Sequence, residues 1–116
     1  MTTKIGARAE TDALAYLVAQ GLTPVTTNYR SRFGEIDLIL RDKDTLIFVE
    51  VRMRSSEQFG GAAYSITPDK RTRLIKTADH YLSQLRHMPR CRFDVVLLGS
   101  GEQPKIEWLR NAITAD

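Results

Sequence analysis

The stretch FGEIDLILRDKDTLIFVEVRMR, residues 33–54, contains the pattern that decides the fold. Acidic and apolar side chains alternate over residues 35–38, and Leu40 continues the apolar positions 36 and 38, which is the period of a β-strand. Residues 46–51 are apolar except for Glu50, as in a strand that is covered on both faces. Polar residues 42–45 separate the two halves. The stretch therefore predicts a β-hairpin that carries carboxylates on an otherwise apolar sheet.

The geometry of this hairpin brings two acids together. Across a symmetric turn, the pairs that face each other are Asp37 with Glu50, Glu35 with Arg52, and Ile39 with Phe48. Opposed side chains share one face, with Cβ atoms roughly 4.5–5.5 Å apart. Two carboxylates at that distance repel each other unless a proton or a cation lies between them. Because Mg²⁺ and Mn²⁺ prefer carboxylate oxygens, Asp37 and Glu50 predict a divalent metal site. A register shift of one residue would remove this prediction.

These residues resemble a known family. Asp37, Glu50 and the cation at position 52 are similar to the core of restriction-endonuclease-like nucleases. GEIDLI, FVEV and RFDVV, in this order, more specifically resemble the YraN-like family of small bacterial proteins, which is related to Holliday-junction resolvases. The resemblance runs from Gly6 to Asn111. It implies an α/β fold with a mixed sheet flanked by helices, in the order α-β-β-β-α-β-β. It also implies DNA binding, metal-dependent cleavage of branched DNA, and a homodimer.

The resemblance assigns roles to individual residues. Asp37 and Glu50 would bind Mg²⁺ or Mn²⁺ together with the main-chain carbonyl of Val51, and Arg52 would bind the scissile phosphate. The family motif has lysine at position 52, and proline where this chain has Ile36. Arginine binds phosphate bidentately, but it stays protonated and cannot act as a general base. Two functions therefore stay open, an endonuclease and a non-catalytic DNA-binding module. In a third alternative, the charged side chains form only an ion-pair network.

Size and composition fit one small intracellular domain. We expect residues 1–116 to form a single domain around one core. Apolar runs are all shorter than the roughly 20 residues of a membrane span. The first residues lack the apolar core of a signal peptide, so we expect a cytoplasmic protein. A single cysteine, Cys91, excludes an internal disulfide and fits a reducing compartment.

Positive charge is concentrated in residues 51–92, which contain nine Lys or Arg and three acids, whereas the whole chain has a net charge of +3. A solvated basic face is the plain explanation. Beside an acidic metal site, binding to phosphates is the better one. The cations assigned to nucleic-acid binding are Arg30, Arg32, Arg54, Lys70, Arg73 and Lys76.

Residues 4–20 predict an amphipathic helix with Glu10 inside its apolar arc. A glutamate directed at the sheet needs a partner. One alternative is an ion pair with an arginine. The other, which the resemblance supports, makes Glu10 an additional acid beside the metal and part of the catalytic set.

Residues 67 and 68, Thr and Pro, predict the start of a second helix. Its expected core stripe is Leu74, Ile75, Ala78, Tyr81, Leu82 and Leu85. His80 and His87 are expected at the surface, and residues 53–65 form a loop beside the site. Further strands are expected at 22–29, 92–99 and 105–109. Asp94 would either support the site or pair with a neighbouring arginine, and Trp108 is expected in the core or an interface.

Overall fold

The computed structural model describes residues 4–53, 66–99, 103 and 105–113, with only the backbone described for residues 4 and 5. It contains a five-stranded sheet whose strands are neighbours in the order of the chain. The strands are β1 (Thr23–Ser31), β2 (Gly34–Asp42), β3 (Thr45–Met53), β4 (Arg90–Leu98) and β5 (Ile106–Ile113).

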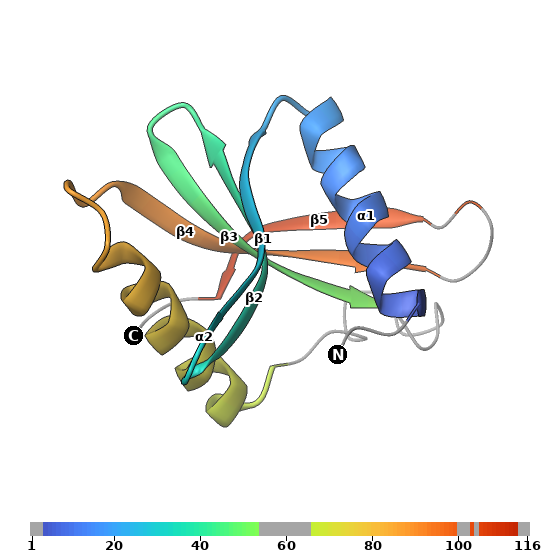
Figure 1. Ribbon diagram of the computed structural model, residues 1–116. Helices are drawn as coiled ribbons and strands as arrows, with labels where there is room; N and C mark the ends of the chain where they lie inside the picture. Colours follow the sequence, from blue (N-terminus) through green and yellow to red (C-terminus); the bar gives the residue numbers. More distant parts are fainter. Residues whose placement is uncertain (1–3, 54–65, 100–102, 104, 114–116) are drawn as a thin grey trace.

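The strand directions explain why one helix interrupts the strands. β3 and β4 are parallel, whereas the other neighbouring pairs are antiparallel. A parallel pair needs a crossover connection, and α2 (Pro68–Leu82) lies in it. Together with α1 (Lys4–Ala19), the order is α-β-β-β-α-β-β, which confirms the predicted fold class (Figure 1).

The two helices cover opposite faces of the sheet, and each has its own apolar cluster (Figure 1). α1 contributes Ala9, Ala13 and Leu17 to one cluster, and α2 contributes Leu74, Ala78 and Leu82 to the other. Successive residues of β3 point to alternate clusters: Leu46 and Phe48 toward α2, Ile47 and Val49 toward α1. A strand buried on both faces is therefore apolar throughout, as the sequence of β3 predicts.

The helix ends follow their local sequence signals. Gly21 has φ +103° just after α1, a conformation that glycine adopts without steric cost. Before α2, the Thr67 side chain accepts a hydrogen bond from the Lys70 backbone N–H at 3.2 Å. The expected core stripe of this helix is wrong at its last position, because α2 ends at Leu82 and Leu85 is 37% exposed.

The β2–β3 hairpin has the predicted register only over part of its length. Residues pair symmetrically from Asp42 with Thr45 to Leu38 with Val49, and the ladder ends there. The predicted pairings of Asp37 with Glu50 and of Glu35 with Arg52 are wrong, because the β2–β3 ladder stops before it reaches them. On the other edge of β2, Glu35 stays paired with Arg30 of β1.

The cause is a local irregularity at Asp37. Leu38 packs in the α1 cluster and Ile36 in the α2 cluster, although residues two apart on a regular strand share a face. Across from this point, Asn28 of β1 has φ +52°. The first residues of β2, from Gly34 to Ile36, are thus paired with β1 but not with β3. We refer to the place beside Asp37 where β2 and β3 are no longer paired as the notch.

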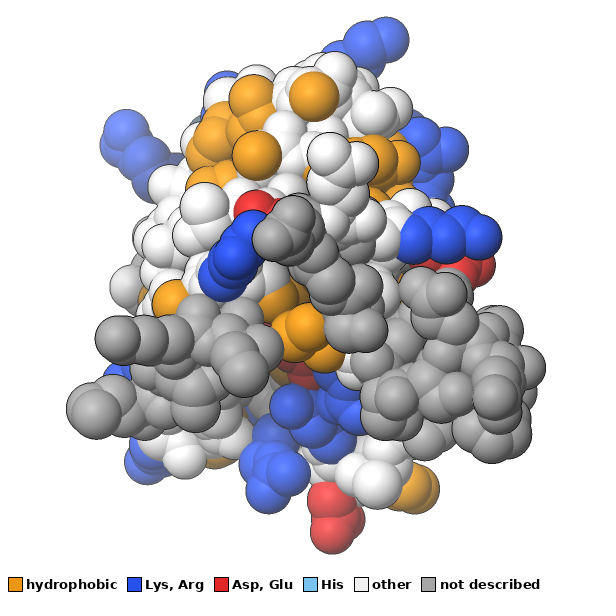
Figure 2. All heavy atoms as spheres, turned by 90° about the vertical axis from the view of Figure 1, so that its right-hand side faces the viewer, with side chains coloured by type: hydrophobic (Ala, Val, Ile, Leu, Met, Phe, Trp, Pro, Cys, Tyr) orange, Lys and Arg blue, Asp and Glu red, His pale blue; other side chains and the backbone are white. Residues whose placement is uncertain are grey.

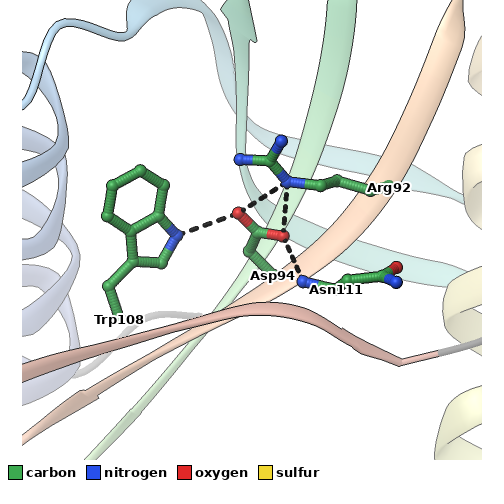
Figure 3. A network of polar contacts seen from close by, with 4 residues as sticks. All are labelled: Arg92, Asp94, Trp108 and Asn111. Atoms are coloured by element: carbon green, nitrogen blue, oxygen red, sulfur yellow. Dashed lines mark hydrogen bonds and ion pairs between the residues drawn. The ribbon is translucent and has the colours of Figure 1, made fainter.

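A buried carboxylate joins β4 and β5 at the far edge of the sheet (Figure 3). Asp94 has no exposed surface. Its oxygens accept hydrogen bonds from Arg92 Nε at 3.0 and 3.2 Å, from Trp108 Nε1 at 2.9 Å, and from the Asn111 backbone N–H at 2.8 Å. The β4–β5 register shifts between Phe93 and Val95. Asp94 therefore holds this irregular part of β5 in place, and its role is structural.

No helix in the described ranges is both long enough and apolar enough to span a membrane. Cys91 is exposed and has a free thiol.

Candidate metal centre and nucleic-acid interface

Asp37 lies where β2 and β3 separate. Its Oδ2 accepts a hydrogen bond from the Val51 backbone N–H at 2.8 Å. The side chain thus takes over a donor of β3 just beyond the end of the ladder, and this contact holds the carboxyl group against β3. Burial, followed by the hydrogen bond and the negative charge of Glu50, raises the pKa of Asp37 to about 9, although the Val51 N–H opposes the shift.

Glu50 is the second member of the pair and is 5% exposed. Its Oε2 lies 3.0 Å from Lys70 Nζ on α2. This contact is an ion pair without hydrogen-bond alignment, and Oε2 accepts no hydrogen bond among the described residues. A buried carboxylate oxygen without a hydrogen bond is energetically costly. The atom is therefore suited to accept a further ligand.

Glu10 and Glu35 extend the acidic group toward α1. One carboxylate oxygen from each of Glu10, Glu35 and Asp37 lies within 4.8 Å of the others. The Asn28 amide, oriented with its nitrogen toward these acids, donates to Glu10 Oε1 at 3.0 Å and to Glu35 Oε1 at 3.2 Å. Burial is the main cause that raises the pKa of Glu10, and the hydrogen bond from Asn28 opposes it. The arrangement unites acids from α1, β2 and β3.

The oxygen-rich donor set fits Mg²⁺ or Mn²⁺. Asp37 is held beside Glu50 at the cost of a raised pKa, and Glu50 Oε2 has spare acceptor capacity. A divalent ion would relieve both problems at once, because it neutralises the repulsion and binds the oxygen.

A pocket of about 170 Å³ adjoins the pair. It is lined by Gly34, Glu35, Asp37, Glu50, Lys70, Arg73 and Leu74. Gly34 allows the β1–β2 hairpin to approach α2 closely. It has φ +152°, and a Cβ there would lie 3.3 Å from Thr77 Oγ1. Acids from the sheet and cations from α2 therefore face the same small space.

A basic surface continues from this pocket. The Arg32 guanidinium carbon lies 4.9 Å from the centroid of the Phe33 ring, and Lys76 Nζ lies 5.9 Å from it. Arg73 extends from the same face of α2 into the pocket lining. Arg30 forms an ion pair with Glu35, in which its Nε lies 3.4 Å from Glu35 Oε2. We refer to Arg30, Arg32, Phe33, Arg73 and Lys76 as the hairpin–helix surface.

Aromatic contacts fix the β1–β2 hairpin against α2. Tyr29 lies edge-on to Tyr81 at 5.1 Å between ring centroids. Its hydroxyl group contacts His80 Nδ1 and accepts a hydrogen bond from Gln84 Nε2 at 2.6 Å.

On the molecular face shown in Figure 2, Lys and Arg side chains gather at the lower centre, with a small acidic area above them. Acidic and basic groups are therefore neighbours on the surface as well.

The structure brings together five of the residues that the sequence singled out, namely Asp37, Glu50, Glu10, Lys70 and Arg73. Arg52 is half-buried at the end of β3 and does not line the described pocket. Arg54 lies outside the described residues. His80 and His87 are exposed, as expected.

Two site residues escaped the sequence reasoning. Glu35 was placed opposite Arg52, although its spacing of two from Asp37 is a signal that the side chains share a side of the strand. Asn28 offered no signal, because its place depends on the β1–β2 register and on its positive φ.

Comparisons with known proteins decide the family. Residues 9–98 match the model described as "Uncharacterised protein family UPF0102". The chain belongs to this family. A UPF0102 protein of Nitrosomonas europaea is 57% identical over 107 residues, which cover 92% of this chain and 91% of that protein. A UPF0102 protein of Cupriavidus taiwanensis is 56% identical, over 96% of this chain and 83% of that protein.

A third relative, a UPF0102 protein of Methylobacillus flagellatus, is 49% identical over 97% of this chain and 98% of that protein. UPF0102 is the YraN-like family, so the resemblance noted in GEIDLI, FVEV and RFDVV is confirmed.

Proposed function

We propose that this protein binds DNA and hydrolyses phosphodiester bonds at a divalent metal ion bound by Asp37 and Glu50. The observation that carries the proposal is the carboxyl pair of half-buried Asp37 and buried Glu50, which adjoins a pocket also lined by Lys70 and Arg73. Acids that bind a metal and cations that bind a phosphate are the two components of metal-assisted phosphodiester cleavage. The family resemblance adds the Val51 carbonyl as a ligand.

Each group of residues has a separate task. A bound Mg²⁺ or Mn²⁺ would supply Lewis-acid activation of the phosphate and of water. Asp37 and Glu50 hold the ion, and Glu10 lies on the α1 side of the site, where one of its carboxylate oxygens is within 4.8 Å of one of Asp37. Arg73, on the pocket wall, neutralises phosphate charge, and Arg52 stays a candidate for the same task from β3.

The hairpin–helix surface supports DNA as the substrate. Exposed cations track the phosphate backbone without sequence preference. Arg32 and Lys76 both lie close to the Phe33 ring, and an aromatic ring beside cations suits the binding of an unpaired base and its phosphate. Unpaired or distorted bases occur at branches, so the surface favours branched DNA over regular duplex. The homodimer implied by the resemblance stays a prediction, which sedimentation on a four-way junction would test.

The first test is single-turnover cleavage of an end-labelled four-way junction in Mn²⁺. We expect metal-dependent cutting by the native protein. Glu50→Gln should lower the rate by about 10²-fold or more, because it weakens the metal site. The matched control is Asp44→Asn in the turn at the other end of the same hairpin, where the side chain is exposed. This variant should cut at the native rate.

Two outcomes would contradict the proposal. Cutting that survives Glu50→Gln would reveal a contaminating nuclease. Tight, salt-sensitive junction binding without metal-dependent cutting would instead favour the non-catalytic DNA-binding module, in which the acids serve only structure.

A further inference from the structure

Lys70 differs from Lys76, a second lysine of α2, in what it contacts. Its Nζ lies 3.0 Å from Glu50 Oε2, and its side chain is 40% exposed. Lys76, by contrast, lies against the Phe33 ring on the outer surface. Lys70 therefore joins the acidic pair from within the pocket and still has access to solvent, and to any phosphate that enters.

The local structure fixes this position. Thr67 caps the helix by accepting the Lys70 backbone N–H, and Pro68 occupies the first helical turn. Lys70 is consequently in the first turn of α2, where a cation opposes the helix macrodipole at a cost of a few tenths of a kcal/mol. Helix stability does not explain a lysine here, whereas an acid pair and an incoming phosphate do.

We propose that Lys70 supplies the ammonium group of this site and takes the place of the lysine that the nuclease motif has at position 52. The inference rests on the proposed function. The motif delivers its lysine from the strand that also carries the second acid. In this protein the strand position holds Arg52, and α2 brings an ammonium group to the same acid from across the pocket.

In the reaction, a water oxygen forms a bond to phosphorus, and the bond between phosphorus and the leaving deoxyribose oxygen breaks. Water loses one proton to solvent, and the leaving oxygen takes one from solvent. Lys70 keeps its own protons. Its ammonium group would leave Glu50, which would hold the metal together with Asp37, and would lie against the non-bridging phosphate oxygens, where negative charge accumulates.

The alternative is that Lys70 is only a counter-ion of Glu50. The two roles make different predictions for Lys70→Met at saturating Mn²⁺ and saturating junction DNA. A phosphate-binding ammonium group predicts a rate about 10²–10³-fold lower, as for the loss of one preorganised charge donor. A counter-ion predicts an unchanged rate, because the metal has replaced it.

The second readout does not depend on cleavage. Junction binding is measured against salt concentration in Ca²⁺, which occupies the site in place of Mg²⁺ or Mn²⁺. Lys70→Met should reduce the slope of log K against log salt by about 0.9, which corresponds to one lost phosphate contact. The matched control is Lys43→Met in the β2–β3 turn, an exposed lysine remote from the pocket, which should change neither slope nor rate.

A third variant shows whether a loss of activity comes from the lost charge or from a disturbed structure. Lys70→Arg retains the charge and should keep the salt slope of the native protein. Native-rate cutting by Lys70→Met, with Glu50→Gln inactive, would overturn the role of Lys70 and leave the proposed function standing. An unchanged salt slope in that variant would also overturn it. A native protein that binds junctions but never cuts would overturn the proposed function together with this inference.

Discussion

Two buried carboxylates in this protein have opposite surroundings. Asp94 has no exposed surface and accepts hydrogen bonds from Arg92, Trp108 and the Asn111 backbone, so every donor is part of the fold. Glu50 is almost as buried, yet within the part of the chain that the structure describes its Oε2 has only the ion pair with Lys70 and no hydrogen bond.

The difference teaches how to separate a structural acid from one that is ready for a ligand. Fixed donors compensate the burial of Asp94 completely, and removing the acid would leave them unpaired. Glu50 is under-compensated and shares its surroundings with Asp37, whose pKa is raised. The divalent cation that we propose for this site would compensate the second arrangement, whereas the first needs no further ligand.

The largest expected effect is on stability. Asp94→Ala should lower the free energy of unfolding by about 3–5 kcal/mol, because Arg92 and the Trp108 N–H lose their partner inside the sheet. Glu50→Gln should change it by less than about 1 kcal/mol in EDTA, because it removes a charge that raises the pKa of Asp37 along with an ion pair whose lysine side chain is 40% exposed. Urea unfolding of both variants measures the contrast. Equal losses would mean that Glu50 is as structural as Asp94.

A second, smaller effect concerns pH. The pKa of Asp37 is raised in the folded protein from its ordinary 3.8 to about 9. Between these values the folded state binds a proton that the unfolded state has lost. The free energy of unfolding in EDTA should therefore fall as pH rises through this window, by at most about 1.4 kcal/mol per pH unit from this group.

Asp37→Asn should flatten this dependence, and Asp44→Asn should preserve it. A bound metal replaces the proton, so Mn²⁺ should raise the melting temperature more at pH 8 than at pH 6 in the native protein. In Asp37→Asn the shift should be absent. A native stability that is independent of pH between 6 and 8.5 would contradict the close contact of the two acids.

The sequence predicted the paired part of the hairpin correctly because its cause is local. A two-residue turn and the alternation of apolar side chains determine the register from Asp42–Thr45 to Leu38–Val49. The same reasoning identified Asp37, Glu50 and Glu10, since acids in apolar patterns need a reason to be there.

The sequence did not predict the notch. Its cause is tertiary, because Asn28 adopts a positive φ, β2 leaves β3 at Asp37, and Glu35 consequently turns to β1. The position of Lys70 depends on the packing of α2 across the hairpin, which no sequence period encodes. Lys70 was recognised as a cation for nucleic acid but not as the neighbour of Glu50.

The smallest expected effect is on the salt dependence of junction binding, and it concerns the hairpin–helix surface. Arg73→Ala combined with Lys76→Ala should weaken junction binding and reduce the salt slope by about 1.8, since each lost phosphate contact contributes about 0.9. The control pair is Lys43→Ala with Arg86→Ala, two exposed cations away from the hairpin–helix surface. Both double variants lose the same charge, so they change the overall field equally. The salt slopes of the two double variants can therefore differ only if the phosphates contact Arg73 and Lys76 specifically. Equal slopes would mean that the hairpin–helix surface contributes no more than its positive charge.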